Sequence, residues 1–86
     1  MRIRFTERFL RSYGELTGSE QELVDKALRL LASDWRYPSL RVKKMQGRSG
    51  IWEARANQSL RITFEISGDV ILLRNVGQHD KTLDNP

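Results

Sequence analysis

Apolar and polar residues alternate with a period of two in the second half of the chain, most clearly between residues 51 and 67. Because successive side chains of a strand point to opposite faces, this alternation predicts strands with one buried face and one solvent-exposed face. The pattern predicts strands over residues 41–45, 51–56, 60–67 and 70–76. A short alternating segment at residues 2–5, with Ile3 and Phe5 on one face, predicts a further strand at the start.

The first half of the chain repeats its apolar residues at helical spacing instead. Thr6 is a suitable N-cap for a helix that runs to about Leu16, because a threonine hydroxyl accepts a hydrogen bond from the first turn. The apolar stripe of this helix contains Phe9, Leu10, Tyr13 and Leu16. This spacing predicts an amphipathic helix that packs on the sheet.

Gly18 is expected to break the chain before a second helix. Ser19, with Glu22 three residues later, has the spacing of a capping box, in which each side chain accepts a hydrogen bond from the other residue's main-chain N–H. The helix is expected to end near Ser33, and its apolar stripe contains Leu23, Ala27, Leu30 and Leu31.

The connector that follows, residues 34–38, is aromatic. We expect Trp35 and Tyr37 to hold this connector against the core, because large aromatic side chains bury much apolar area. The alternative is a platform on which nucleobases stack.

The order strand, two helices, four strands predicts an α+β fold, in which a helical hairpin packs on one face of a mainly antiparallel four- to five-stranded sheet. The other face is expected to be open to water or a partner. Eighty-six residues predict one domain, residues 1–86, with one modest core.

The chain has no cysteine, which excludes disulfides and thiolate metal sites, so we expect no metal and no cofactor. No apolar run approaches the roughly 20 residues of a membrane span, and the N-terminal residues lack the apolar core of a signal peptide. A cytoplasmic protein with no membrane contact is therefore expected.

Positive charge is concentrated in one segment of the chain, whose overall net charge is +4. Residues 41–61 carry six basic side chains and a single acidic one, Glu53. The basic residues are Arg41, Lys43, Lys44, Arg48, Arg55 and Arg61. Such a cluster favours binding to a polyanion such as a phosphate backbone. The alternative is a solvated lysine-rich strand edge that prevents aggregation.

The pairing register between residues 51–56 and 60–67 can be predicted from the intervening loop. A three-residue loop at 57–59 keeps apolar residues opposite apolar residues, whereas a two-residue loop would mix the two faces. The three-residue loop pairs Trp52 with Phe64, Ala54 with Ile62 and Ala56 with Leu60 on the buried face. On the exposed face it places Arg55 opposite Arg61 and Glu53 opposite Thr63.

Two arginines that face each other across a strand pair cost free energy when nothing lies between them. A bound phosphate or carboxylate would turn this repulsion into a clamp, because each guanidinium can bind an anion through two N–H groups. The alternative is that Glu53 neutralises Arg55 and Arg61.

His79, the only histidine, follows the last predicted strand. A two-residue turn at 68–69 pairs Ile66 with Ile71 and gives His79 the parity of the buried face. A bulge at Gly77 would bring His79 to the exposed face instead, because a bulge shifts the alternation by one residue. A carboxylate, two guanidiniums and an imidazole on one face are the groups that phosphodiester cleavage requires, although a lone histidine can also be structural.

These segments together resemble the RelE/ParE superfamily of toxin–antitoxin toxins. The resemblance lies in the basic stretch 40–47, Gly-Ile-Trp-Glu-Ala-Arg, Leu-Arg-Ile-Thr-Phe-Glu-Ile, Gly-Asp-Val-Ile-Leu-Leu and Val-Gly-Gln-His-Asp, in that order. It is strongest for the branch that contains RelE and YafQ. It implies the toxin of a type II toxin–antitoxin system, an endoribonuclease that cuts mRNA, in the ribosomal A site, through attack by the RNA's own 2′-hydroxyl. The implied partners are a cognate antitoxin, in a hetero-oligomer, and mRNA with the ribosome.

The resemblance also implies roles for individual residues. Glu53 would be the general base and His79 the general acid, while Arg55 and Arg61 would stabilise the charged phosphorane. Arg41, Lys43, Lys44 and Arg48 would bind RNA, and Leu83 stands where many members carry an aromatic residue that stacks on a base. RelE itself has lysines at the positions of Glu53 and Arg55. The alternatives are a ParE-like module that inhibits DNA gyrase by binding, and an inactive toxin fold that only binds its antitoxin.

Overall fold

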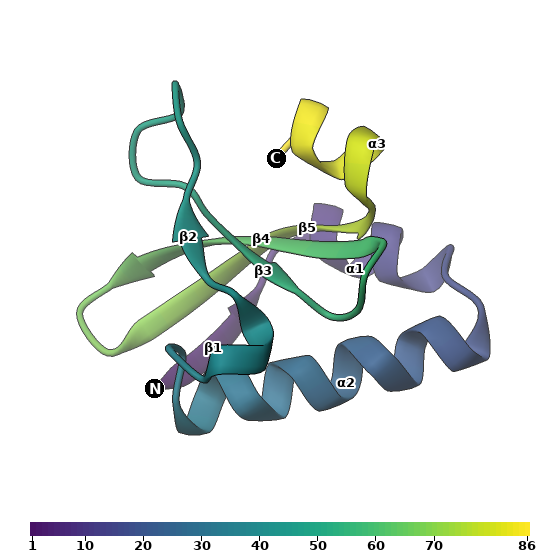
Figure 1. Cartoon of the computed structure of the whole chain (residues 1–86), viewed down its shortest axis with the longest axis horizontal. Coiled ribbons are helices and arrows are strands. Elements are labelled where there is room, and N and C mark those ends of the chain that lie inside the picture. The colour runs from purple at the N-terminus through teal and green to yellow at the C-terminus, as the bar shows by residue number, and fades with distance from the viewer.

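A five-stranded mixed sheet with the order β1-β5-β4-β3-β2 forms the centre of the computed structural model, which describes residues 1–86 (Figure 1). The strands are β1 (Arg2–Phe5), β2 (Lys43–Lys44), β3 (Trp52–Arg55), β4 (Leu60–Ser67) and β5 (Val70–Gln78). β1 pairs parallel with β5, and every other pair is antiparallel. The predicted α+β fold with a mainly antiparallel sheet is confirmed.

Helices cover both sides of this sheet (Figure 1). They are α1 (Glu7–Gly14), α2 (Gly18–Ser33), the short 3-10 helix η1 (Pro38–Leu40) and α3 (His79–Asp84). In Figure 1, α2 runs below the sheet and α3 lies above it. None of these helices has both the length and the apolar character of a membrane span.

Thr6 caps α1 as predicted: its hydroxyl accepts a hydrogen bond from the main-chain N–H of Phe9 at 3.1 Å. The same hydroxyl donates to the carbonyl of Leu73 at 2.9 Å, which ties the start of α1 to β5. The helix ends at Gly14, two residues before the predicted end at Leu16. The carbonyl of Tyr13 accepts a hydrogen bond from the Gln21 side chain at 2.9 Å, so α2 supplies a partner for this end of α1.

The capping box of α2 lies two residues earlier than predicted. The Thr17 hydroxyl accepts from the N–H of Glu20 at 3.2 Å, and the Glu20 carboxylate accepts from the N–H of Thr17 at 2.9 Å. Thr17 has the extended backbone of an N-cap, and Gly18 is the first helical residue rather than a break. The prediction of Ser19 and Glu22 as the capping pair was wrong because both candidate pairs have the same spacing.

The apolar stripe of α2 is rotated relative to the prediction. Its buried residues are Val24, Ala27 and Leu31, whereas Leu23 is 38% exposed. Leu23 and Val24 are about 100° apart around the helix axis, so only one of them can share the face of Ala27 and Leu31 that is fully buried. Ala27 and Leu31 were predicted correctly, and the predicted position of Leu23 was wrong.

The core lies between α1, α2 and one face of the sheet. The sheet contributes Ala54, Leu60, Ile62, Phe64, Ile71, Leu73 and Val76. Phe9, Val24, Leu31 and Leu40 pack onto this face from the helices, and each is at most 1% exposed. Complete burial of such side chains contributes about 1.5–3 kcal/mol each, so this face supplies the main stabilisation of the fold.

The predicted register between β3 and β4 is confirmed. Trp52 faces Phe64 and Ala54 faces Ile62 on the core side, while Glu53 faces Thr63 and Arg55 faces Arg61 on the other side. Between β4 and β5, the predicted pairs Phe64–Leu73 and Ile66–Ile71 are also present. The three-residue loop at 57–59 therefore keeps the two faces of the sheet separate.

A bulge interrupts β5 at Arg74, three residues before Gly77, the position that the sequence offered for a bulge. Phe64 pairs with Leu73 but Thr63 pairs with Asn75, so Arg74 is the extra residue. A bulge shifts the alternation by one residue. From Asn75 onward, the side chains of β5 that share the face of Arg61 are therefore the odd-numbered ones, which gives Gly77 the position opposite Arg61.

The predicted bounds of β2 and β5 and one predicted burial were wrong. β2 contains only Lys43 and Lys44, because Arg41 adopts a left-handed conformation with φ of 46° at the end of η1. β5 extends two residues beyond its predicted end. In the aromatic connector, Trp35 packs against the core as expected, whereas Tyr37 is 43% exposed.

Candidate functional site

The second face of the sheet is polar, and α3 covers part of it. Its buried polar side chains are Glu53, Arg61, Thr63 and Asn75. The prediction that this face is open was wrong, because α3 and the residues after it fold back over β4 and β5 (Figure 1). Thr82 of α3 is only 2% exposed. The covered part of this face is therefore a second, polar layer of packing.

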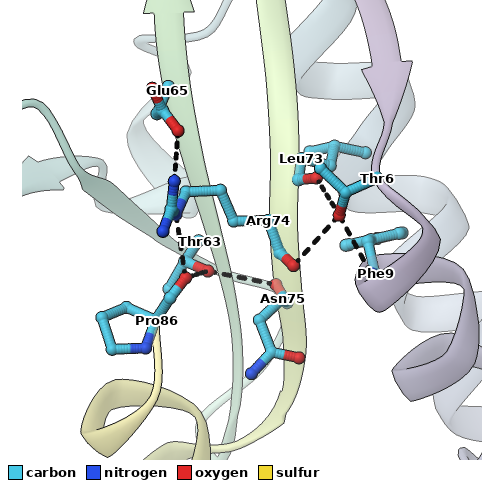
Figure 2. Close-up of polar contacts among 8 residues, drawn as sticks. All are labelled: Thr6, Phe9, Thr63, Glu65, Leu73, Arg74, Asn75 and Pro86. Atoms are coloured by element: carbon cyan, nitrogen blue, oxygen red, sulfur yellow. Dashed lines mark hydrogen bonds and ion pairs between the residues drawn. The ribbon is translucent and has the colours of Figure 1, made fainter.

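Figure 2 shows how the bulge holds this cover in place. The Arg74 side chain forms an ion pair with Glu65, and its Nε donates to the Pro86 carbonyl at 3.1 Å. The Thr63 hydroxyl donates to the same Pro86 oxygen at 3.0 Å. The Asn75 side chain donates to the carbonyl of Asn85 at 2.9 Å. Residues 85–86 are thus bound to the sheet by the side chains around the bulge.

Arg61 is 4% exposed, and one of its terminal nitrogens donates to the carbonyls of Asn57, Gln58 and Leu60 at 3.0–3.1 Å. These bonds join the guanidinium to the loop between β3 and β4. Arg61 was expected on a solvent-exposed strand surface, and this expectation was wrong. Its side chain closes the loop that sets the register of β3 and β4.

Burial and the neighbouring charges of Arg55 and Glu53 all affect the pKa of Arg61. Burial lowers the pKa of Arg61 below its usual value, the positive charge of Arg55 lowers it further, and the charge of Glu53 raises it by a smaller amount. Two guanidiniums share this face with one carboxylate, which also lies near the Lys43 ammonium, so the arginine pair keeps a net positive charge by count. This finding argues against the alternative in which Glu53 neutralises the pair.

Glu53 has a cationic partner on the neighbouring strand. Its carboxylate lies 3.9 Å from the Lys43 ammonium, and the two residues face each other in the β2–β3 ladder. Glu53 also lines a hollow of about 250 Å³ with Lys43, Lys44, Met45 and Gln46. This hollow gives the otherwise buried carboxylate access to the surface.

His79 is the first residue of α3, and its main-chain N–H donates to the Ser59 carbonyl at 2.8 Å. This bond places it beside the β3–β4 loop that Arg61 closes. The imidazole is half exposed, and its Nδ1 lies 2.7 Å from the Asp80 carboxylate. The bulge at Arg74 places Gly77 opposite Arg61, but His79 belongs to α3, so the alternation of β5 does not assign its side chain to a face. His79 makes no hydrogen bond with Glu53, Arg55 or Arg61.

The candidate RNA-binding residues fall into two groups. Lys43 and Lys44 form the exposed edge strand, and Arg41 precedes them at the end of η1. Arg48 instead donates to the Asp84 carbonyl at 3.2 Å, beside α3. Leu83 of α3 is half-buried. The six basic residues of the 41–61 segment are therefore not one continuous patch.

A second basic hollow of about 600 Å³ contains residues that the sequence did not suggest. Arg8, Arg74 and Lys81 line it together with Arg48 and Asp84. They come from α1, β5 and α3, so no local motif could have grouped them. No cluster of three or more histidine, cysteine, aspartate or glutamate side chains is positioned to hold a metal ion.

Solved toxin structures share this fold over nearly the whole chain. RelE in the RelB–RelE antitoxin–toxin complex of Methanococcus jannaschii superposes with a TM-score of 0.76 at 21% identity, covering 96% of this chain and 99% of that one. YafQ from Escherichia coli gives 0.79 at 10% identity, with 95% and 98% covered. The YoeB/ParE toxin of Agrobacterium tumefaciens gives 0.76 at 15%, with 92% and 99% covered. No family model and no curated protein sequence matches the chain. The chain has the RelE/ParE toxin fold.

Proposed function

We propose that this protein is the toxin of a toxin–antitoxin system and cleaves mRNA in the cytoplasm. The observation that carries this proposal is that Arg55 faces Arg61 on the polar face of a RelE/ParE fold, with Glu53 as the one carboxylate beside them on β3. Such a pair is stabilised when an anion binds between the two guanidiniums. Several of the similar structures are complexes of a toxin with its antitoxin, which supports an antitoxin as the partner that keeps this protein inactive.

In the proposed reaction, the Glu53 carboxylate removes the proton of the RNA 2′-hydroxyl, and the 2′-oxygen attacks the adjacent phosphorus. The bond from phosphorus to the 5′-oxygen breaks, and His79 donates a proton to the departing oxygen. The products are a 2′,3′-cyclic phosphate and a free 5′-hydroxyl. Arg55 and Arg61 stabilise the negative charge that develops on the non-bridging oxygens.

The two arginines contribute differently. Arg61 is held rigidly by the loop carbonyls, so its remaining N–H groups are oriented before the substrate arrives. Arg55 is half-buried, and its side chain takes part in none of the ion pairs of the structure. Arg55 is therefore the better residue for testing the site by mutation, because it is not needed to hold the loop.

Expression of the chain without a partner is expected to arrest growth, and mapping of mRNA 5′ ends is expected to reveal new cleavage sites. Arg55→Ala should reduce cleavage by about 10²–10³-fold, the usual effect of removing one oriented charge-stabilising group. Arg2→Ala is the matched control, since Arg2 is an exposed arginine on β1, at the opposite edge of the sheet. Comparing reactions with and without ribosomes determines whether cleavage requires the A site. Growth arrest without RNA cleavage would contradict the proposal and favour gyrase inhibition by binding.

The pH dependence of cleavage tests the two acid–base roles. A bell-shaped profile is expected, because Glu53 must be ionised and His79 protonated. Glu53→Gln should remove the acid limb, and His79→Ala the alkaline limb, each with a loss of about 10²–10⁴ in rate. A His79→Ala variant that cuts at the parent rate would exclude this residue as the general acid.

A further inference from the structure

A hollow of about 350 Å³ lies beside β3. It is on the core side of this strand, whereas the candidate active site is on the opposite side. It is lined by Trp35, Arg36, Tyr37, Pro38, Arg41, Val42 and Trp52. Its volume is within the range of about 300–1,000 Å³ that is typical of small-molecule sites. The proposed cleavage reaction uses none of its aromatic residues. The hollow also contains both tryptophans of the chain.

The aromatic side chains of the hollow differ in how deeply they are packed. The rings of Trp35 and Trp52 are 5.3 Å apart in an edge-to-face arrangement, with an interplanar angle of 78°. Both indoles are half-buried and pack on the core, so their positions are fixed by the fold. Tyr37, in contrast, is 43% exposed and has a ring available for a stacking partner.

An exposed cationic side chain lies over each indole ring, in a position that a ligand can take instead. The Arg36 guanidinium lies 4.7 Å from the centre of the Trp35 ring, and the Lys44 ammonium lies 5.3 Å from the centre of the Trp52 ring. An exposed contact of this kind contributes about 0.5–1 kcal/mol. A nucleobase stacked on an aromatic side chain contributes about 1–3 kcal/mol. A base can therefore displace either cation, which then becomes available to a phosphate.

The edge strand β2 connects this hollow to the candidate active site. Lys44 faces Trp52 and Lys43 faces Glu53 in the β2–β3 ladder. Trp52 and Glu53 are adjacent in the chain and point to opposite faces of the sheet. A nucleic acid strand that passes around this edge would meet a lysine on either side. The two sites are thus close enough for one RNA strand to occupy both.

We propose that this hollow binds a base of single-stranded RNA that flanks the cleaved phosphate. The base stacks on Tyr37 and the tryptophan rings, and Arg41 with Lys44 binds the adjoining phosphate. This assignment rests on the proposed function, because it takes RNA as the ligand. An acidic peptide would use the cations but would gain no stacking energy from the aromatic rings, so the aromatic content of the hollow favours a nucleic acid.

Tryptophan fluorescence is a direct measure of binding here, because both tryptophans line the hollow. The full chain is titrated with a 2′-O-methyl RNA pentanucleotide, which lacks the attacking hydroxyl and is not cleaved. An abasic pentamer with the same phosphates is the matched ligand. Quenching is expected with the base-containing strand, and the abasic strand should bind about 5- to 150-fold more weakly, in line with one stacked base.

Variants assign the effect to the hollow. Tyr37→Ala should weaken binding by a similar factor, and Tyr37→Phe should restore it, since phenylalanine keeps the ring. Leu10→Ala is the control, because Leu10 is an exposed apolar residue of α1 and does not line the hollow. Thermal denaturation verifies that each variant is folded.

Equal binding of the abasic strand, equal quenching by an acidic peptide, or unchanged affinity in Tyr37→Ala would overturn the proposal. Failure of this base-binding proposal can be distinguished from failure of the proposed cleavage function. Base-dependent quenching in a protein that cuts no RNA would support the hollow and contradict the reaction. RNA cleavage with no base-dependent quenching would support the reaction and contradict the hollow.

Discussion

At the scale of single residues, Arg61 combines a structural role with a proposed chemical one. Its guanidinium donates to the carbonyls of Asn57, Gln58 and Leu60, in and next to the β3–β4 loop, and it faces Arg55 on the polar side of the sheet. A loss of the proposed cleavage activity in an Arg61 variant would therefore have two explanations, a missing charge or a disordered loop. Measurements of stability separate them.

Arg61→Ala is expected to lower the free energy of unfolding by about 1–3 kcal/mol, because it leaves loop carbonyls without their donor. Arg55→Ala should change it by less than about 0.5 kcal/mol, since Arg55 is half-buried and holds no loop. Urea denaturation of both variants measures these differences. Equal stability of the parent and the Arg61→Ala variant would show that the loop does not depend on this side chain.

Tyr13 gives the protein a stability component that depends on pH. Its hydroxyl donates to the Asp25 carboxylate at 2.7 Å, and this hydrogen bond, followed by burial and the charge of Asp25, raises the pKa of Tyr13 above its usual 10.0. Below that usual value the tyrosine is protonated in both states, so the stabilisation is complete. As the pH rises through the interval up to the folded-state pKa, the unfolded chain loses its proton first and the stabilisation is lost.

The parent is therefore expected to be more stable than Tyr13→Phe near pH 8, and the difference should shrink above about pH 10. Chemical denaturation of both proteins over this pH range gives the comparison. A constant difference across the range would show that the pKa of Tyr13 is not raised in the folded state.

At the scale of elements, the start of α2 depends on Thr17 and Glu20, each of which satisfies a main-chain N–H of the other. Thr17→Ala should lower the free energy of unfolding by about 0.5–2 kcal/mol, as expected for loss of an N-cap. Ser19→Ala is the matched control and should be close to neutral, because Ser19 lies within the helix. Thermal melts are sufficient for this comparison. A larger effect of Ser19→Ala than of Thr17→Ala would show that Ser19, the residue predicted from the sequence, is the N-cap.

The packing of α3 depends on a close approach at Gly77. A Cβ at this position would lie 2.8 Å from the Thr82 hydroxyl oxygen, and the φ of 158° is one that residues with a side chain rarely adopt. Gly77→Ala should therefore destabilise the protein, and part of the loss should be recovered in Gly77→Ala/Thr82→Ala. Denaturation of the two single variants and the double variant gives the coupling energy. Purely additive effects would show that the contact with Thr82 is not what requires glycine.

At the scale of the whole molecule, the basic residues are divided between the β2 edge and the hollow beside α3. If RNA contacts about four of them through phosphates, the logarithm of the association constant should fall with the logarithm of salt concentration with a slope near −3. Lys43→Ala should reduce the slope by about 0.7, whereas Lys26→Ala, on the exposed surface of α2, should leave it unchanged. Binding titrations at several salt concentrations test this, and a slope near zero would contradict phosphate binding.

The local pattern of residues was sufficient to predict the strands, the start of α1 and the register between β3 and β4. The reason is that the period of two and the loop length leave only one register in which Trp52 and Ala54 meet apolar partners. The order of the segments was also sufficient for the fold, which the solved toxin structures share. The position of Glu53, Arg55 and Arg61 on one face follows from the same register.

Only the tertiary structure decided how that face is covered. α3 has six residues, which are too few for a periodic signal or for a helix that is stable by itself. Its position depends on the hydrogen bond from His79 to Ser59 and on the close approach of Gly77 to Thr82. The bulge at Arg74 likewise depends on partners far along the chain, Glu65 and Pro86. The burial of Arg61 and the hollow around Trp35 and Trp52 arise from contacts between segments that are distant in sequence. Local rules extend over only a few residues, so they could place the charged side chains on a face but could not determine their surroundings.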